Sequence, residues 1–532
     1  MQLDNGNISG FFLEMEQQGL KGRVIIWGLI ALLVIAYWLT IKIHLLESLA
    51  YTADLFHAVQ SSSSYLHGRP LLFNNRFGAE AYHHNFFLQL LFGPLTYYFG
   101  AFGLFIIHAG LILLAAVAVA RLSAVIPDRI VAEGSVAILF VLLLGPVAFW
   151  LWDDPTYGWH VELLFLPLAV LFAVALLRNS RWVWLWGTAI VLTREEGAVL
   201  ACCVHLLWLL THHASSQELV GQRAKQLKAI GIKGGRIIFF WLVIFSLGQG
   251  LLVYFSDMGG GRLSAAWSLW QTMLSDGLYS GAIWEMCVGA LLLLFSGAVL
   301  YLFGFRVKIL CYFIFCCLPV LVVTFLGSMT YLDAAALQPH GISWAPRFTL
   351  FWSLLLTGVL FALHTYNSAT VFSPKQNKPK VLKLLLLLIF SIYFQMVTLW
   401  TVKGYDFYGR FVSSYDLKES LLPIAKFSQE DIDFLWCVSN SLPAFTPIAT
   451  SGHLFGIFHK HDLIVPSHVE NAWTKPRLYI CHKPKLLPYS YACNKALRQS
   501  DRDLYQRKRI FRLLVGYDAT LADTVKRCSL RN

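Results

Sequence analysis

The sequence predicts an α-helical protein that crosses a membrane about eleven times and carries a small soluble α/β domain at its C-terminal end. The first observation is composition: 57% of the 532 residues are hydrophobic and only 14% are charged. Soluble domains contain about 25% charged residues, so this chain has too few to cover a surface that faces water. The second is a mean hydropathy of +0.59. The third is that apolar runs of about 20 residues, long enough to cross a bilayer as helices, recur along the chain.

The first apolar run, 24–46, follows Lys21 and Arg23. It is longer than the apolar core of a secretory signal, which has about 7–15 residues, so we expect an uncleaved first span. Residues 1–23 then form a cytoplasmic N-terminus. The further candidate spans are 101–121, 131–151, 161–177, 182–193, 197–211, 237–255, 283–305, 309–328, 348–366 and 383–401.

The placement of basic residues in the short connections sets the predicted orientation. With a cytoplasmic N-terminus, the inside connections hold most of the Lys and Arg residues, as the positive-inside rule requires. This bias holds at every turn only if 85–99 does not cross the membrane. That segment is apolar but short and contains Gly93 and Pro94, so we expect it to lie at the interface. The sequence thus predicts a transmembrane domain over 24–401, in which 47–99 is a long first extracytoplasmic loop with interfacial helices.

The same topology places residues 402–532 outside, as a soluble extracytoplasmic domain. Apolar stretches such as Leu463–Val465 and Leu478–Ile480 alternate with turn residues, a pattern typical of strands in a small α/β or β-rich domain. Four cysteines in an oxidising compartment allow two disulfides in three connectivities, and free buried cysteines are the alternative. They are Cys437, Cys481, Cys493 and Cys528.

The net charge of +12 does not indicate a nucleic-acid partner, because many of the basic residues lie in short connections between apolar runs. Topology explains that placement better. We therefore expect a multi-pass protein of the cell (inner or plasma) membrane whose principal partner is membrane lipid.

The first outside loop contains candidate site residues. In a helix, a spacing of three places Asp54, His57 and Gln60 along one stripe. The loop ends in His83 and His84, which are also explained as polar residues at the interface. Ionisable side chains at the edge of a span are costly unless they are paired or hydrated, so a functional site is a reasonable hypothesis here.

Later outside connections add further ionisable residues at the same predicted face. A helix-capping turn or a tight outside turn would explain several of them equally well. These candidates are Asp153, Asp154, His160, Arg194, Glu195, Glu196, His340 and Arg347. Oxygen and nitrogen ligands of these types would suit a divalent cation such as Mg²⁺ or Mn²⁺, but no spacing is specific for one, and metal ligands stay unassigned.

Several short motifs together are similar to those of a widespread, uncharacterised family of prokaryotic multi-spanning membrane proteins, a domain of unknown function. Tyr51–Gln60 resembles its Tyr-Asp-Leu…Gln opening motif, and His84 before Pro94-Leu95 resembles its His…Pro-Leu-Tyr element, with Thr96 in place of the Tyr. His160 with Glu162 resembles Asp-Phe-His-x-Glu, although Gly158 stands where that family has the Asp.

Two more elements complete the resemblance, which covers most of the chain. Arg194-Glu195-Glu196 is similar to a Lys/Arg-Glu-Asp element, and 450–454 with 464–466 resembles a motif in the outside tail. The family in turn resembles the GT-C superfamily of glycosyltransferases, which take a sugar from a polyprenyl-phosphate donor on the outer face.

The resemblance implies a GT-C-like fold, a polyprenyl-phosphate sugar as the donor substrate and an acceptor that the sequence does not name. It implies a catalytic role for Asp54 as general base, with Glu195 and Glu196 as further catalytic carboxylates. Arg194 and Arg347 are then candidates for the lipid phosphate. His57, Gln60, His83, His84, Asp153, Asp154, His160 and His340 complete the predicted substrate-binding set.

Two other classes of function fit the same sequence. A non-catalytic subunit of a membrane assembly, with a protein partner in the membrane, would use a GT-C-like scaffold without its chemistry. A transporter of lipid or solute would place broken or charged helices near the middle of the bilayer, often in repeated halves, and no internal repeat is visible. The clustering of polar residues at one predicted face favours chemistry at the interface.

Overall fold

The computed structural model describes about half of the chain, and most of that part is helical. Candidate spans 283–305 and 383–401 lie outside the described residues, as does all of 131–151 except two positions. The described residues are 22, 24–40, 42–43, 46, 51, 53–76, 86–125, 139, 143, 158–215, 223–255, 271, 311–320, 345–368, 429–450, 454–465, 472–482, 503–506, 511–515 and 519–531.

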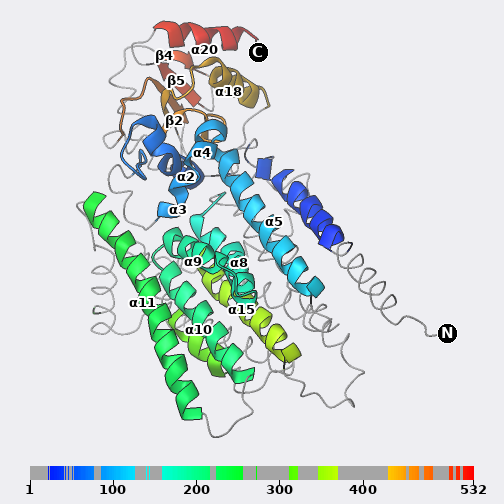
Figure 1. Cartoon of the computed structure of the whole chain (residues 1–532). Helices are drawn as coiled ribbons and strands as arrows, with labels where there is room; N and C mark the ends of the chain where they lie inside the picture. The colour runs from blue at the N-terminus through cyan, green and yellow to red at the C-terminus, as the bar shows by residue number, and fades with distance from the viewer. Residues whose placement is uncertain are drawn as a thin grey trace, which may run out of the picture.

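A bundle of long helices forms the larger part of the molecule (Figure 1). The prediction of separate helices at 182–193 and 197–211 is confirmed, since one helix ends at Thr193 and the next begins at Gly197. The helices of the bundle are α5 (Ala101–Val125), α8 (Phe165–Leu177), α9 (Trp182–Thr193), α10 (Gly197–Ser215), α11 (Arg223–Phe255) and α15 (Ala345–Ser368).

Helix α8 lies at the centre of this bundle. Every residue from Phe165 to Leu176 is buried, and α8 packs against α5, α9, α10 and α15. A helix that is apolar on all sides must be covered on all sides, which explains its central position.

Other apolar helices leave large side chains uncovered. Leu33 in the helical segment Val24–Thr40 is 70% exposed, and Phe239 and Leu247 in α11 are 69% and 61% exposed. Two described helices, Ala101–Ser123 and Ile232–Leu251, are long and apolar enough to cross a membrane by length and composition. These exposed surfaces are the part of the bundle that water would solvate poorly.

The first loop folds into short helices at one end of the bundle. They are α2 (Ala53–Ser63), the 3₁₀ helix η1 (Ser64–His67), α3 (Phe87–Leu90) and α4 (Gly93–Phe99). The segment 85–99 is thus divided between two helices of 4 and 7 residues. Neither is long enough to cross a bilayer, which needs about 20 residues.

The C-terminal part is an α/β unit with one mixed sheet of order β2-β1-β3-β5-β4. Strands β2, β1 and β3 are parallel, whereas β5 pairs antiparallel with both β3 and β4. The helices are α18 (Gln429–Ser441) and α20 (Ala519–Arg531); the strands are β1 (Pro447–Thr450), β2 (Asp462–Ile464), β3 (Leu478–His482), β4 (Asp503–Gln506) and β5 (Phe511–Val515).

A disulfide between Cys437 and Cys528 joins α18 to α20 across 91 residues of sequence. The sequence left two alternatives open for the four cysteines of this domain, two disulfides or free buried thiols. Cys493 lies outside the described residues, and only the backbone of Cys481 is described, in β3. A second disulfide stays a prediction.

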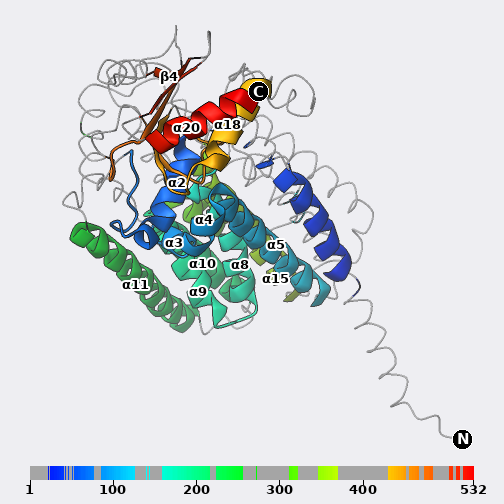
Figure 2. The same cartoon turned by 90° about the horizontal axis from the view of Figure 1, so that it is seen from above.

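The α/β unit lies directly on the first-loop helices, as both views show (Figures 1 and 2). The ring of Phe56 in α2 meets that of Phe455 at 5.6 Å, and the ring of Phe102 in α5 meets that of His459 at 5.6 Å. Buried apolar side chains form one continuous cluster from the bundle into this unit. The first loop is therefore enclosed between the bundle and the C-terminal sheet.

Candidate functional site

A buried ion pair between Glu162 and Arg194 lies at the end of the bundle that faces the first loop. Glu162 belongs to a 3₁₀ turn, Val161–Leu164, that leads into α8, and Arg194 follows the last residue of α9. The guanidinium Nη1 of Arg194 donates a hydrogen bond to Glu162 Oε1, and the two residues are 3% and 4% exposed. The pair thus joins the start of α8 to the end of α9, and these two helices pack against each other in the bundle.

The backbone at Arg194 explains why this side chain reaches Glu162. Helix α9 stops at Thr193 because Arg194 is extended, with φ −169° and ψ 165°. Gly197 then begins α10 so close to α9 that a Cβ there would lie 1.9 Å from the carbonyl oxygen of Ile190. Only glycine fits this close approach, and the resulting tight turn directs residues 194–196 to one place.

The side chain of Arg194 lies close to three carboxylates. Its Nε lies 3.0 Å from Glu196 Oε2 and 3.9 Å from Glu195 Oε1. His160 Nδ1 lies 3.6 Å from Glu162 Oε2. One guanidinium therefore faces three carboxylates. We call Glu162, Arg194, Glu195, Glu196 and His160 the acidic cluster.

Helix α15 reaches the same cluster. The hydroxyl of Thr349 donates a 3.0 Å hydrogen bond to the carbonyl oxygen of Glu162. Arg347 lies two residues earlier in the first turn of α15, where its backbone position is described. The backbone of Arg347 therefore lies near Glu162.

Lys42 is a buried cation that the sequence reasoning missed. It is 1% exposed, its Nζ donates a 2.9 Å hydrogen bond to the carbonyl oxygen of Gly158, and it lies 4.9 Å from the ring centroid of Phe105. The signal was present: Lys42 interrupts the first apolar run, and an ionisable residue there is a functional candidate by default. It holds the backbone two residues before His160.

Helix α2 begins beside this backbone. The ring of Tyr51 packs over Gly158, where φ is +79° and an added Cβ would lie 2.7 Å from Tyr51 Cγ. Asp54 follows in the first turn of α2, and its backbone position is described. The start of α2 and the acidic cluster are thus neighbours.

The rest of the predicted stripe on α2 contacts the C-terminal unit. Gln60 Nε2 donates a 2.7 Å hydrogen bond to the carbonyl oxygen of Leu463, and Gln60 Oε1 accepts one from the backbone N–H of Asn75. His57 is buried with its ring 6.1 Å from that of Phe455. The helical spacing was predicted; the partner of this stripe was not.

Five predicted site residues, His83, His84, Asp153, Asp154 and His340, lie outside the described residues. Among the residues that are described, no group of three or more His, Cys, Asp or Glu side chains has an arrangement that could hold a metal ion. The described carboxylates of the acidic cluster instead surround a guanidinium.

No protein-family model matches this chain, and neither the curated proteins nor the solved structures include a significant match.

Proposed function

We propose that this chain is a membrane glycosyltransferase with a GT-C-like fold of about eleven spans, which moves a sugar from a polyprenyl-phosphate donor to an acceptor on the extracytoplasmic face. The observation that carries the proposal is the buried acidic cluster directly beside the start of α2. It supplies closely spaced carboxylates next to the helix that holds Asp54, and the C-terminal unit covers that helix. Three residues of the sequence motifs described above, Tyr51, His160 and Arg194, lie at this end of the bundle.

The exposed apolar side chains support a position within a lipid bilayer. Tyr37, Leu33 and Phe239 are more than half exposed on helices whose composition suits lipid contact. Arg121, near the end of α5, and Arg178, after the end of α8, lie near each other at the end of the bundle that the charge bias places in the cytoplasm. With the N-terminus inside, α2, the acidic cluster and the C-terminal unit are extracytoplasmic.

In this mechanism, the acceptor hydroxyl loses its proton as it attacks the anomeric carbon, and the carboxylate of Asp54 accepts that proton. The transition state is oxocarbenium-like, so positive charge develops on the sugar ring. The carboxylates of the acidic cluster stabilise it, with Glu195 as the most accessible of them because its side chain is 25% exposed. The phosphate of the donor leaves toward Arg347 at the start of α15.

The structure refines the expected role of Arg194. Its guanidinium is buried and paired with Glu162 and Glu196, so we assign it to positioning those carboxylates rather than to the lipid phosphate. The carboxylates of the acidic cluster are arranged around this guanidinium.

The test is sugar transfer by the purified full-length chain in lipid nanodiscs. Lipids that co-purify are first identified by mass spectrometry, and the polyprenyl-phosphate sugar found is then supplied in labelled form. Asp54→Asn is expected to lower transfer by about 10³-fold or more, since a general base contributes about 10²–10⁴. Asp523→Asn, the same change at an exposed position on α20, is the matched control and should keep full activity.

Full transfer by Asp54→Asn would remove Asp54 as the base. If no polyprenyl-phosphate sugar co-purifies and none is used as a donor, the glycosyltransferase proposal fails. The alternative, a non-catalytic subunit, is favoured by one observation: Arg194 is already occupied by protein carboxylates. It predicts a stoichiometric membrane partner that stays bound when Asp54 is replaced.

A further inference from the structure

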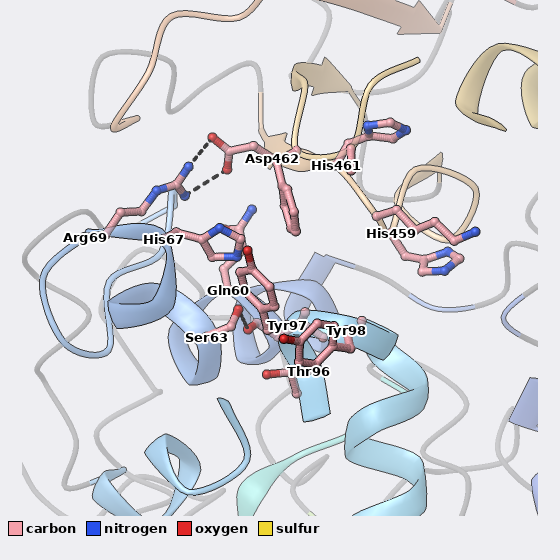
Figure 3. Close-up of a pocket in the computed structure, with 15 residues that line it drawn as sticks. Gln60, Ser63, His67, Arg69, Thr96, Tyr97, Tyr98, His459, His461 and Asp462 are labelled. Carbon is pink, nitrogen blue, oxygen red and sulfur yellow. Dashed lines mark hydrogen bonds and ion pairs between the residues drawn. The ribbon is translucent and has the colours of Figure 1, made fainter. Parts of the chain in front are cut away.

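A separate cavity of about 150 Å³ lies between the first loop and the C-terminal unit. Figure 3 shows its lining: side chains from α2, η1 and α4 on one side and from two loops of the α/β unit on the other. Among the lining residues are Gln60, His67, Tyr97, Phe445 and His461. Neither half of the chain forms this cavity alone.

Aromatic rings form one wall of the cavity. The ring of Phe445 lies 4.4 Å from that of His67 and 5.3 Å from that of Tyr97, with the latter pair stacked at 29°. Tyr98 continues the row at 5.1 Å from Tyr97 and is 77% exposed. Among the described residues, no hydrogen-bond partner is found for the His67 ring or the Tyr97 hydroxyl, so both are available to a ligand.

The backbone at Phe445 is strained in a way that keeps its ring in this position. Its φ is +61°, a left-handed conformation that is uncommon for a bulky residue. Hydrogen bonds on either side hold the loop: the amide of Phe445 donates to the carbonyl oxygen of Lys460, and the amide of Asp462 donates to that of Thr446. The ring is nevertheless 40% exposed. Such strain is concentrated at ligand sites, because a surrounding structure must maintain it.

The charges around the cavity are balanced. Arg69 donates two hydrogen bonds to Asp462, of 2.9 and 2.5 Å, so each neutralises the other. Burial lowers the pKa of His459 to about 4 and also lowers the pKa of His67 and His461, so all three imidazoles are neutral near pH 7. The remaining charge is the ammonium of Lys460, which is exposed. An anionic ligand would find no unpaired cation inside the cavity.

We infer that this cavity binds one uncharged pyranose ring, with its C–H face on Phe445 and Tyr97 and its hydroxyl groups on His67 and the Tyr97 hydroxyl. An aromatic wall with a few placed polar groups is the usual composition of a small-ligand site. A cavity of about 150 Å³ in an engineered protein core binds one benzene molecule, so the volume suits a single six-membered ring.

The position of the cavity relates it to the proposed transfer. Val59, Gln60 and Ser63 of α2 line it, whereas Asp54 is in the first turn of the same helix. Six residues of helix rise about 9 Å, which is close to the length of two linked sugars. A ring bound here is then the distal unit of an acceptor glycan whose terminal hydroxyl lies near Asp54. This last assignment, unlike binding itself, rests on the proposed function.

Binding is tested directly by saturation-transfer NMR on the full chain in phospholipid nanodiscs, prepared without glycoside detergents. The probes are the methyl glycosides of glucose, galactose and mannose, and N-acetylglucosamine, with glucuronate as the charged comparison. At least one neutral probe is expected to bind saturably with a Kd of about 1 mM, and glucuronate roughly tenfold more weakly.

Two variants remove the site by different routes. Phe445→Gly removes part of the aromatic wall and relieves the strain of the left-handed backbone at this position. Ala444→Trp adds a bulky side chain at another residue that lines the cavity and keeps all of its aromatic residues. Each is expected to weaken binding by at least roughly tenfold. Asn440→Trp, an equally bulky change at an exposed position of α18 outside the cavity, is the control and should bind normally.

The inference is overturned if no neutral probe binds, if glucuronate binds more tightly, or if Ala444→Trp binds as the wild type does. Because the assay needs no donor, it separates the two proposals. Sugar binding without transfer would support this binding site and reject the glycosyltransferase proposal. Transfer without sugar binding would support the glycosyltransferase proposal and reject this binding site.

Discussion

Two buried arginine–carboxylate pairs join distant parts of this chain, and they differ in their surroundings. In the bundle, Arg194 faces Glu162, Glu195 and Glu196, so three carboxylates lie around one guanidinium. Between the first loop and the sheet, Arg69 and Asp462 match one to one in a bidentate pair.

The carboxylate of the second pair accepts further hydrogen bonds. The side-chain amide of Asn75 donates a 2.6 Å hydrogen bond to Asp462 Oδ1, and the hydroxyl of Thr474 donates one of 3.0 Å to Oδ2. Such a one-to-one pair, with added hydrogen bonds to its carboxylate, holds two units together in one orientation. An unbalanced group is less favourable for stability alone, which is the expected signature of a functional site.

Breaking the bundle pair should have the largest effect on stability. Arg194→Leu leaves Glu162 buried without its cation, and we expect a loss of about 4 kcal/mol in the free energy of unfolding. Denaturant unfolding in micelles measures it. The double variant Glu162→Gln/Arg194→Gln, which leaves no unpaired charge at this pair, should recover about half of the loss. If the double variant is no better than Arg194→Leu, the pair is not held by charge.

Removing the disulfide should affect the C-terminal unit and not the bundle. Cys437→Ser/Cys528→Ser opens a link that spans 91 residues, and we expect a loss of about 3 kcal/mol. Hydrogen exchange should rise in α18 and α20 while α8 and α10 stay protected. Equal loss of protection in α8 would mean that the two regions unfold as one unit.

Weakening the interface pair should cost less than breaking the pair in the bundle, because its partners have other hydrogen bonds. Asp462→Asn retains the shape but removes the charge that Arg69 needs, and we expect a loss of about 2 kcal/mol. The amides of β2 and of residues 70–76 should exchange faster. Asp433→Asn, at an exposed position on α18, provides the control, and an equal effect there would contradict the role assigned to Asp462.

The smallest expected effect is a dependence on pH in the C-terminal unit. The unfolded chain protonates His459 near its ordinary pKa of 6.5, whereas burial lowers the folded pKa to about 4. The unfolded state therefore binds more protons between these values, and the stability present above pH 6.5 is lost as the pH falls toward 4. Between pH 7.5 and 5.5 we expect a loss of about 1 kcal/mol.

That dependence is measured by unfolding at both pH values. His459→Gln should reduce the difference in unfolding free energy between the two pH values. A His459→Gln variant with the full dependence would assign the effect to other groups.

Local patterns in the sequence located several elements well. The apolar runs predicted the helices at 182–193 and 197–211, and the stretches Leu463–Val465 and Leu478–Ile480 lie within one residue of β2 and at the start of β3. The Asp54–Gln60 spacing is helical, as expected. These features depend on periodicity and on turn residues that are close together in the chain.

The partners of the polar residues were not predictable in the same way. The sequence by itself determined that Arg194 interrupts two apolar helices and that Gln60 lies on a helical stripe. Only the tertiary structure decided that Arg194 meets Glu162, that Gln60 meets Leu463 and that Arg69 meets Asp462, 393 residues later. Side-chain pairing across such distances follows from how whole helices and the sheet pack, and packing depends on the shape of every buried surface rather than on local spacing.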